Sequence, residues 1–226
     1  METQVKLCAG RRPNFILGFT GTRAEAEQIK QQLRIFLREG LKLELSSEKT
    51  LITHARNGRA HFLGYEIHTL HADDKHDPRG QRCINGAIGL RVPKRVIHEH
   101  CSKYMRRGKP YHLRQRTNDS VYSIIAQYQT EYRGVVQYDR LAYNIHQLGR
   151  LKWVMQQSLV RTLSKKLKIS TAQVYRRYKT THPNEYGTYK VLAATLKREA
   201  GQPPLVARFG GIHQRCAYGP NLEWMQ

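Results

Sequence analysis

Apolar and polar positions at the start of the chain predict a strand followed by an amphipathic helix. Residues 15–19 form a short apolar run that is typical of a buried strand. Thr22 and Glu25 have the spacing of a capping box, in which each side chain bonds the backbone N–H of the other residue. Apolar residues then recur at helical spacing as far as Gly40, a natural stop. We therefore expect one helix between Thr22 and Gly40.

The next fifty residues carry the two-residue period of β-strands. Alternation over residues 41–45 predicts a half-buried strand, and residues 50–54 predict a second strand that pairs back onto it. Residues 61–67 predict a further strand with a central glycine. Residues 71–92 begin with a polar stretch, so we expect a loop or hairpin linker there. The first part should thus combine a helix with short antiparallel strands.

From Pro93 onward the apolar period becomes helical. Pro93 suits the first position of a helix that would run to about Arg107, before the break at Gly108. Asn118 or Asp119 is expected to cap a second helix. The longest helical period in the chain runs in steps of three and four through Leu141, Ile145, Leu148, Leu151, Met155, Leu159, Leu163 and Leu167.

The C-terminal part gives a weaker signal. Ser170 or Thr171 is expected to begin a short helix that ends at Tyr178. Residues 189–198 also predict a helix, whereas the chain beyond Gly201 has no regular period. The whole pattern predicts an α+β protein, in which a helix and short strands precede an all-α part.

The charge of the chain is large and uneven. Among 226 residues, 39 Lys and Arg outnumber 17 Asp and Glu, which gives a formal net charge of +22 and an isoelectric point near 10.2. Residues 1–92 carry a net charge of +5, and residues 93–226 carry +17. So large an imbalance favours a polyanion, most simply nucleic acid, over a merely solvated surface. The binding surface is expected mainly in the second part.

The cysteines and histidines do not predict a metal site. Four widely spaced cysteines without a Cys-x-x-Cys pair argue against a zinc ribbon and suit reduced thiols. His98, His100 and Cys101 would point to different faces of a helix, so they cannot easily share one ion. For the histidines that lie near Asp73 and Asp74, a solvated loop is favoured over a site for a divalent ion. We expect no metal bound to these groups.

The sequence shows no sign of a membrane or secretory protein. No apolar run approaches the roughly 20 residues that a membrane-spanning helix needs, and the N-terminus lacks the apolar core of a secretory signal. Glu2 and the short lead-in argue against an organelle transit peptide. We expect a protein of the bacterial or archaeal cytoplasm, rather than of an organelle matrix, without a membrane partner.

Three stretches of the first part resemble the palm of group II intron-encoded reverse transcriptases. Residues 15–22, Phe-Ile-Leu-Gly-Phe-Thr-Gly-Thr, resemble the strand that follows the family's Tyr-Ala-Asp-Asp box. Residues 41–53 resemble a motif with Glu-Lys-Thr, and Lys49 takes the position of a lysine near the incoming nucleotide. A Phe-Leu-Gly-Tyr stretch resembles the hairpin that grips the primer end, and its primer-proximal residues would be Phe62, Gly64 and Tyr65.

Three stretches of the second part resemble the maturase-specific X domain of the same family. They are residues 132–138, 148–153 and 158–168, and the order and spacing of all the motifs strengthen the match. In that family the X domain is the helical thumb of the enzyme and binds intron RNA. The resemblance covers about residues 14–180, and it implies that the second part is an RNA-binding thumb.

The positions that carry catalysis in the family are altered in this chain. Residues 11–14, Arg-Arg-Pro-Asn, occupy the four positions of the Tyr-Ala-Asp-Asp box, whose two carboxylates bind the catalytic metal ions. Cationic, ring and neutral amide side chains are poor ligands for a hard cation. Asp73 and Asp74 follow a different strand and do not replace the box. We expect no catalytic residue and no cofactor, with Mg²⁺ bound only if an intact palm completes the site.

The basic residues of the second part are the candidate RNA-binding groups. Cations contact phosphates, and tyrosine or arginine planes stack on unpaired bases, as Tyr175 and Tyr178 could do between their basic neighbours. Cations at a helix C-terminus also stabilise the helix, an alternative role for residues 165–168. Tyr128, Tyr132 and Trp153 lie on or near apolar stripes and are expected in the core. The candidates are Lys94, Arg95, Arg106, Arg107, Lys109, Arg150, Lys152, Arg161, Lys165, Lys166, Lys168, Arg176, Arg177 and Lys179.

The resemblance implies a division into a palm remnant at residues 1–70, a linker at 71–92, a helical X domain at 93–180 and a partly helical or disordered tail at 181–226. The chain starts after the family's fingers and stops before its nuclease, so we expect a truncated or degenerate C-terminal piece. It would bind group II intron RNA and assist splicing without polymerising. Two alternatives stay open: one part of a split polymerase with a separately encoded palm, and a non-functional pseudogene product.

Overall fold

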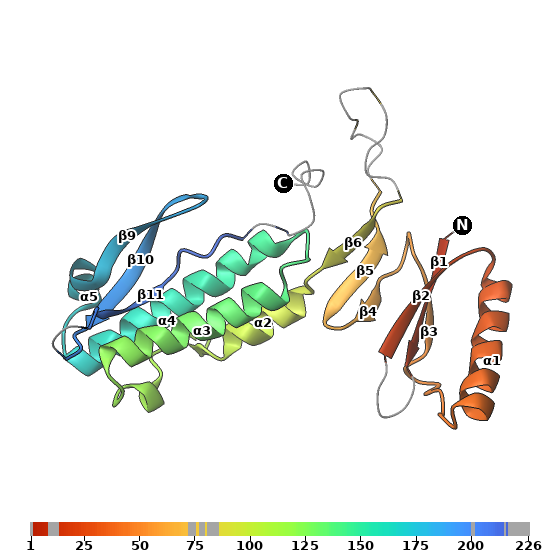
Figure 1. Ribbon diagram of the computed structural model, residues 1–226, viewed down its shortest axis with the longest axis horizontal. Helices are drawn as coiled ribbons and strands as arrows, with labels where there is room; N and C mark the ends of the chain where they lie inside the picture. The colour runs from red at the N-terminus through yellow and green to blue at the C-terminus, as the bar shows by residue number, and fades with distance from the viewer. Residues whose placement is uncertain are drawn as a thin grey trace. The chain divides into compact units, whose positions relative to one another are not determined.

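The protein forms two compact units, one within residues 1–93 and the other within residues 94–217 (Figure 1). Each unit combines helices with antiparallel strands, so the α+β class predicted from the sequence is confirmed. The computed structural model describes residues 2–8, 14–71, 76, 80, 86–199, 202–214 and 216.

A three-stranded antiparallel sheet opens the first unit. Strand β1 (Glu2–Cys8) lies between β2 (Asn14–Thr20) and β3 (Leu51–His54). The strand expected at residues 41–45 does not form, and β3 pairs with β1 instead. The reason is local, because the backbone N–H groups of residues 41 and 43 both donate to the Leu37 carbonyl and so end the preceding helix.

Helix α1 (Arg23–Gly40) begins and ends where the sequence predicts. The capping box is complete: the Thr22 N–H donates to Glu25 Oε2 at 2.7 Å, and the Glu25 N–H donates to Thr22 Oγ1 at 3.3 Å. The buried Ala26 allows the helix to approach the sheet closely, and a small apolar cluster surrounds it. Its partly buried members are Phe15, Leu17, Phe19, Leu33, Leu45 and Ile52.

A second sheet of the first unit contains β4 (Ala60–Phe62), β5 (Tyr65–Thr69) and β6 (Ile88–Arg91), in that order. The single strand expected at residues 61–67 is therefore two strands. Leu63 and Gly64 have φ angles of 47° and 82°, which places both in the left-handed region of a tight two-residue hairpin turn. The central glycine thus reverses the chain rather than continuing a strand.

Four helices form the body of the second unit: α2 (Lys94–Ser102), α3 (Val121–Tyr138), α4 (Gly149–Leu167) and α5 (Thr171–Tyr178). Helix α5 begins and ends where the sequence predicts, and Ser170 is its N-cap in a complete capping box with Gln173. The residue that caps α3 is Ser120, not Asn118 or Asp119, because the Ser120 hydroxyl accepts the Ser123 N–H at 3.1 Å.

Two helices of this unit are shorter than the sequence predicts. After α2 the chain forms a hairpin of β7 (Met105–Arg106) and β8 (Lys109–Pro110). The Arg107 and Gly108 φ angles of 50° and 72° make the turn, so α2 cannot reach Arg107. The leucine period that starts at Leu141 first passes through a short 3₁₀ turn, η2 (Ile145–Leu148), and α4 begins only at Gly149. A second 3₁₀ turn, η1, spans Arg114–Arg116.

The second unit is not all-α, which corrects the sequence-based expectation. Strands β9 (Lys179–Asn184), β10 (Gly187–Leu196) and β11 (Leu205–Phe209) form an antiparallel sheet in the order β11-β10-β9. Most of the helix expected at residues 189–198 is strand β10. Its neighbours on both sides satisfy its backbone groups, and this non-local pairing outweighs a weak helical period.

The core of the second unit lies between α3, α4 and the sheet. Tyr128 and Tyr132 of α3 are fully buried, as predicted, and both rings contact Phe209 of β11 at centroid distances of 6.3 and 5.9 Å. The expectation that Trp153 belongs to this core is wrong, because 57% of its surface is exposed. The apolar face of α4 is buried through Leu151, Val154, Met155, Leu159 and Leu163, and Trp153 lies outside it.

Candidate nucleic-acid interface

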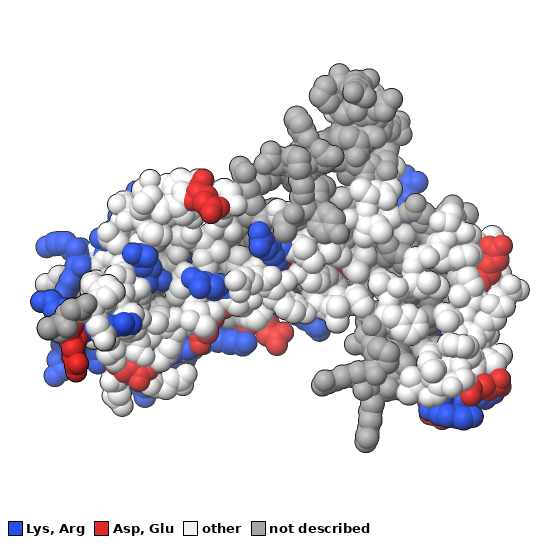
Figure 2. Space-filling view, in the orientation of Figure 1, with Lys and Arg blue, Asp and Glu red and all other residues white. Residues whose placement is uncertain are grey.

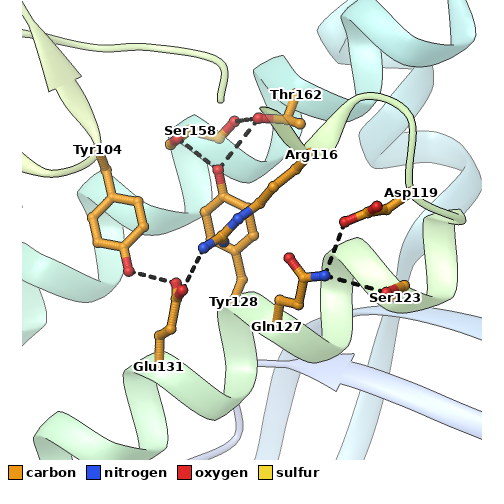
Figure 3. A network of polar contacts seen from close by, with 9 residues as sticks. All are labelled: Tyr104, Arg116, Asp119, Ser123, Gln127, Tyr128, Glu131, Ser158 and Thr162. Atoms are coloured by element: carbon orange, nitrogen blue, oxygen red, sulfur yellow. Dashed lines mark hydrogen bonds and ion pairs between the residues drawn. The ribbon is translucent and has the colours of Figure 1, made fainter. Parts of the chain in front are cut away.

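A buried hydrogen-bond network joins α3 to α4 (Figure 3). The Tyr128 hydroxyl lies 2.8 Å from Ser158 Oγ and 3.3 Å from Thr162 Oγ1, and all three residues are buried. Burial raises the pKa of the Tyr128 hydroxyl, so it stays protonated and able to donate. Because buried polar groups that find partners fix one arrangement of their helices, this network sets the spacing of α3 and α4.

The same network holds the segment at residues 111–117 against α4. Ser158 Oγ donates to the Tyr111 carbonyl at 2.5 Å, and Thr162 Oγ1 accepts the Leu113 N–H at 3.0 Å. One turn further along, Lys166 Nζ donates to the Thr117 carbonyl at 3.0 Å. The segment has little regular structure of its own, so these contacts with α4 position it.

Arg116 belongs to the structural network rather than to the free basic surface. Its guanidinium pairs with Glu131 and lies 4.6 Å from the centre of the Tyr128 ring (Figure 3). The Tyr104 hydroxyl donates to the other Glu131 oxygen at 2.6 Å. Burial, followed by this bond to Glu131, raises the pKa of Tyr104 and keeps it a donor. The charge of Arg116 is therefore largely compensated inside the protein.

Other cations converge on His112. The Arg106 guanidinium lies 5.3 Å from the centre of the Tyr111 ring, which is 4.1 Å from the His112 ring. Burial first, and then the charges of Lys165, Arg114 and Arg106, lower the pKa of His112. These cations come from β7, η1 and α4, so three elements contribute to one positive site. We call Arg106, His112, Arg114 and Lys165 the His112 cluster.

The exposed side of α4 extends this positive surface. Arg150, Arg161 and Lys165 are exposed and project from one side of the helix, and the exposed Lys168 follows as its C-cap. The helix contains no Asp or Glu between Gly149 and Leu167. These four cations therefore have no acidic neighbour on their own helix.

Helix α5 adds two exposed cations, Arg176 and Arg177, and the exposed Lys179 follows at the start of β9. The helix is fixed to α4 through Tyr175, whose hydroxyl accepts bonds from the Gln156 and Gln157 amides at 3.4 and 3.2 Å. Lys and Arg side chains gather on the surface where α5 and β9 lie (Figure 2). Tyr175 thus has a structural role, whereas Tyr178 lies beside Arg177, 5.6 Å from its guanidinium carbon.

The structure separates the predicted basic residues into an exposed set and two half-buried members. Lys152 is half-buried, and burial lowers its pKa. Lys166 is half-buried and bonds the Thr117 carbonyl, which gives it a structural role. The exposed members are Lys94, Arg95, Arg106, Arg107, Lys109, Arg150, Arg161, Lys165, Lys168, Arg176, Arg177 and Lys179.

The sequence-based reasoning missed His112 and Arg114. Both lie in a segment without hydrophobic period, and only its hydrogen bonds to Ser158 and Thr162 bring them beside α4. A signal was present in the sequence, because residues 106–116 hold five Lys and Arg without an acidic residue. That density of Lys and Arg indicates a basic segment, but it does not indicate that His112 lies among these cations.

Comparison with known proteins identifies the second unit. Residues 92–203 match the family of type II intron maturases. These residues belong to that family. The maturase match includes α2 to α5 and reaches past β10, so it covers nearly all of the basic surface described above.

Curated relatives extend the similarity into the first unit. The group II intron-encoded protein LtrA of Lactococcus lactis is 30% identical over 180 residues, which cover 74% of this chain and 29% of the relative. The putative COX1/OXI3 intron 2 and intron 1 proteins of Saccharomyces cerevisiae are 26% and 30% identical over 174 residues. Those matches cover 71% and 70% of this chain. The chain spans less than a third of each relative, and the relatives come from a bacterium and a yeast.

The positions that the sequence predicts to be palm-like lie outside the maturase match. Lys49 is exposed in a turn before β3, and Gly64 makes the β4–β5 hairpin turn between Phe62 and Tyr65. Tyr65 is buried and Phe62 is half-buried, so a packing role is present for both. Residues 11–13 and the aspartates at 73 and 74 lie outside the described residues, whereas Asn14 begins β2.

Within the described part of the chain, no three His, Cys, Asp or Glu side chains gather closely enough to hold a metal ion. His98 is exposed on α2, and Cys101 is a buried free thiol whose pKa burial raises. Among the described helices, none has the length and apolar character needed to cross a bilayer.

Proposed function

We propose that this chain binds folded group II intron RNA through its maturase unit and assists splicing without polymerising nucleotides. The maturase family of residues 92–203 supports group II intron RNA as the ligand. The positive charge of the second unit supports binding through the RNA phosphates. Residues 94–217 contain 24 Lys and Arg against six Asp and Glu. Counterion release on phosphate contact is the dominant sequence-independent contribution to binding of such a surface.

The observation that carries the proposal is the rigid support behind the exposed cations. The His112 cluster and the basic side of α4 lie on elements that the Tyr128–Ser158–Thr162 network holds together. Cations fixed in relative position recognise the shape of a folded RNA, because they match only certain arrangements of phosphates.

The first unit supports a role without nucleotidyl transfer. The residues at positions 11–14 are two arginines, a proline and an asparagine, and this donor set does not fit the two metal ions of a polymerase. Strands β1 and β2, which pair antiparallel, lie on either side of that position in the chain. Mg²⁺ chemistry would require carboxylates supplied by a separate palm.

Binding of the full chain to a folded group II intron RNA, compared with a scrambled RNA of equal length across a salt series, tests the proposal. We expect tighter binding to the intron RNA, and we expect the preference to persist at moderate salt. The triple variant Arg161→Ala, Lys165→Ala, Lys168→Ala should lower the salt slope by roughly 3.

The matched control removes three exposed arginines of α1 in the first unit, Arg23, Arg34 and Arg38. This variant loses the same charge, but from the first unit and not from the proposed RNA-binding surface. We therefore expect its preference for the intron RNA to remain. Equal and equally salt-sensitive binding to both RNAs would overturn the proposal and favour a non-functional basic remnant. A splicing assay with a precursor RNA then measures whether specific binding assists the reaction.

The palm-like hairpin favours one second candidate, a split polymerase. In that case a separately supplied palm segment with its aspartates would combine with this chain. Primer extension by the mixture, absent from either part alone, would support it. The relatives' full-length proteins would be the source of such a segment, since this chain spans only part of them.

A further inference from the structure

Trp153 is exposed on a helix that already has a complete apolar face. Its exposed fraction is 57%, whereas Leu151, Val154 and Met155, its neighbours in sequence, are buried in the core. The core does not need a fourth large side chain at this position. Other large apolar side chains are also exposed, but the indole of Trp153 leaves a broad planar face open on a helix that carries only basic charged side chains.

The surroundings of Trp153 are cationic. It lies on the exposed side of α4 that carries Arg150, Arg161, Lys165 and Lys168, and we call these five residues the α4 stripe. At about 100° per residue, Trp153 projects roughly 60° from Arg150, roughly 80° from Arg161 and roughly 120° from Lys165, so it borders the row of cations and Arg150 is the cation nearest to it in direction. At 1.5 Å per residue, Trp153 lies roughly 12 Å along the helix from Arg161.

We propose that Trp153 stacks on an unpaired RNA base while the cations of the α4 stripe contact the phosphates on either side of it. This inference rests on the proposed RNA-binding function and adds the class of RNA element, a duplex that carries a bulged or single-stranded nucleotide. An aromatic ring among cations combines the two parts of single-strand recognition, a stacking face and a backbone track.

Charge decides between an RNA base and a protein surface as the occupant. A protein that covers Trp153 would also cover the four cations of the stripe and would have to supply acidic groups for them, because α4 contains none. RNA supplies a phosphate for each cation and a planar base for the indole at once. The fixed backbone of α4 also limits the conformational freedom lost when the base stacks.

Trp153 fluorescence provides the direct measurement. The chain has two tryptophans, so a Trp224→Phe background leaves Trp153 as the only one. The probes are three RNA hairpins with the same duplex: one with a single bulged nucleotide, one fully paired, and one with an abasic residue at the bulge. We expect strong quenching with the bulged hairpin and much less with the fully paired and abasic hairpins, because only the first offers a free base.

Binding of substituted chains separates stacking from other roles. Trp153→Ala should weaken binding of the bulged hairpin by roughly 5- to 100-fold and leave the fully paired hairpin almost unchanged. Trp153→Phe should restore part of the loss, whereas Trp153→Leu should not. The salt slope should stay the same in all three variants, because no cation is removed. Phe36→Ala, which removes a similarly exposed aromatic of α1, is the matched control and should bind like the unchanged chain.

The outcomes distinguish this inference from the proposed function. If the unchanged chain prefers intron RNA but Trp153→Ala binds every hairpin as the unchanged chain does, stacking is overturned and the proposed function stands. If RNA binds without changing Trp153 emission, the indole faces another partner and the inference is again overturned. If the unchanged chain shows no RNA preference of any kind, both proposals fail.

Discussion

The guanidinium carbon of Arg116 lies 4.6 Å from the centre of the Tyr128 ring, and the same guanidinium pairs with Glu131. Tyr128 in turn bonds Ser158 and Thr162 of α4. One arginine therefore connects the basic segment before α3 to the buried network between α3 and α4. The neighbouring Arg114 is exposed and belongs to the His112 cluster. Two arginines separated by one residue thus have different roles.

Substitution of each arginine by lysine should expose that difference. Arg116→Lys keeps the charge but loses the planar contact with the Tyr128 ring and the fork that meets Glu131, so we expect the free energy of unfolding to fall by about 1–2 kcal/mol. Arg114→Lys should change it by less than about 0.5 kcal/mol. Urea unfolding followed by Trp153 fluorescence in a Trp224→Phe background measures both. Equal stability of the two variants would contradict the assignment.

Lys165 and Lys166 are adjacent in sequence and should affect different properties. Lys165→Ala removes an exposed cation, so the salt slope of RNA binding should fall by about 1 with little change in stability. Lys166→Ala removes the bond to the Thr117 carbonyl, so the chain should lose about 1 kcal/mol of stability. Its salt slope should stay nearly unchanged. The reverse pattern in salt titrations and urea unfolding would contradict the roles assigned to these two lysines.

RNA affinity should rise as the pH falls, and His112 should cause part of that rise. Burial and three cations lower the pKa of His112 in the free chain. A bound phosphate would offset those cations and raise the pKa of His112 again, so the complex takes up a proton as the pH falls. We expect an increase of about three- to tenfold between pH 8 and pH 5.5 at constant ionic strength.

His112→Gln is the control for this pH dependence. The variant keeps a polar side chain of similar size without a titrating group, so it should lose the part of the increase that His112 provides. Dissociation constants measured for both chains at the same pH values give the difference directly. Identical pH profiles would show that no phosphate binds next to His112.

Asp139 should make the chain less stable as the pH rises through the weakly acidic range. Burial raises the pKa of Asp139 from 3.8 to about 6, and its backbone caps the C-terminus of α3, where a negative charge is unfavourable. The folded chain therefore binds this proton more tightly than the unfolded chain does. The free energy of unfolding should fall as the pH rises from about 4 to about 6, and the loss should persist above that.

Asp139→Asn should remove this dependence. We expect the variant to be more stable than the unchanged chain by about 2 kcal/mol at pH 8 and equal to it near pH 4. Urea unfolding at both pH values measures the difference, and Glu185→Gln, an exposed carboxylate in the β9–β10 turn, controls for the loss of one negative charge. A variant that is less stable at pH 8 would contradict the assigned cost of burial.

The helix starts that depend on neighbouring residues were predictable. The capping boxes at Thr22 and Ser170 lie within four residues of chain, and both form as the sequence indicates. The burial of Tyr128 and Tyr132 was also predictable, because α3 has a single apolar side. The exposure of Trp153 was not predictable, because apolar spacing alone does not determine which of several possible faces of α4 packs against the core.

The sequence by itself determined the caps, the helical register of α1 and α5, the basic excess of the second part and the motifs of its family. These depend on a few adjacent residues or on composition. Only the tertiary structure decided that β10 is a strand, that β3 pairs with β1, and that the charges of Arg106, Arg114 and Lys165 act on His112. These features depend on hydrogen bonds and burial between segments far apart in the chain, and the free energy of such contacts exceeds the local preferences that a sequence pattern records.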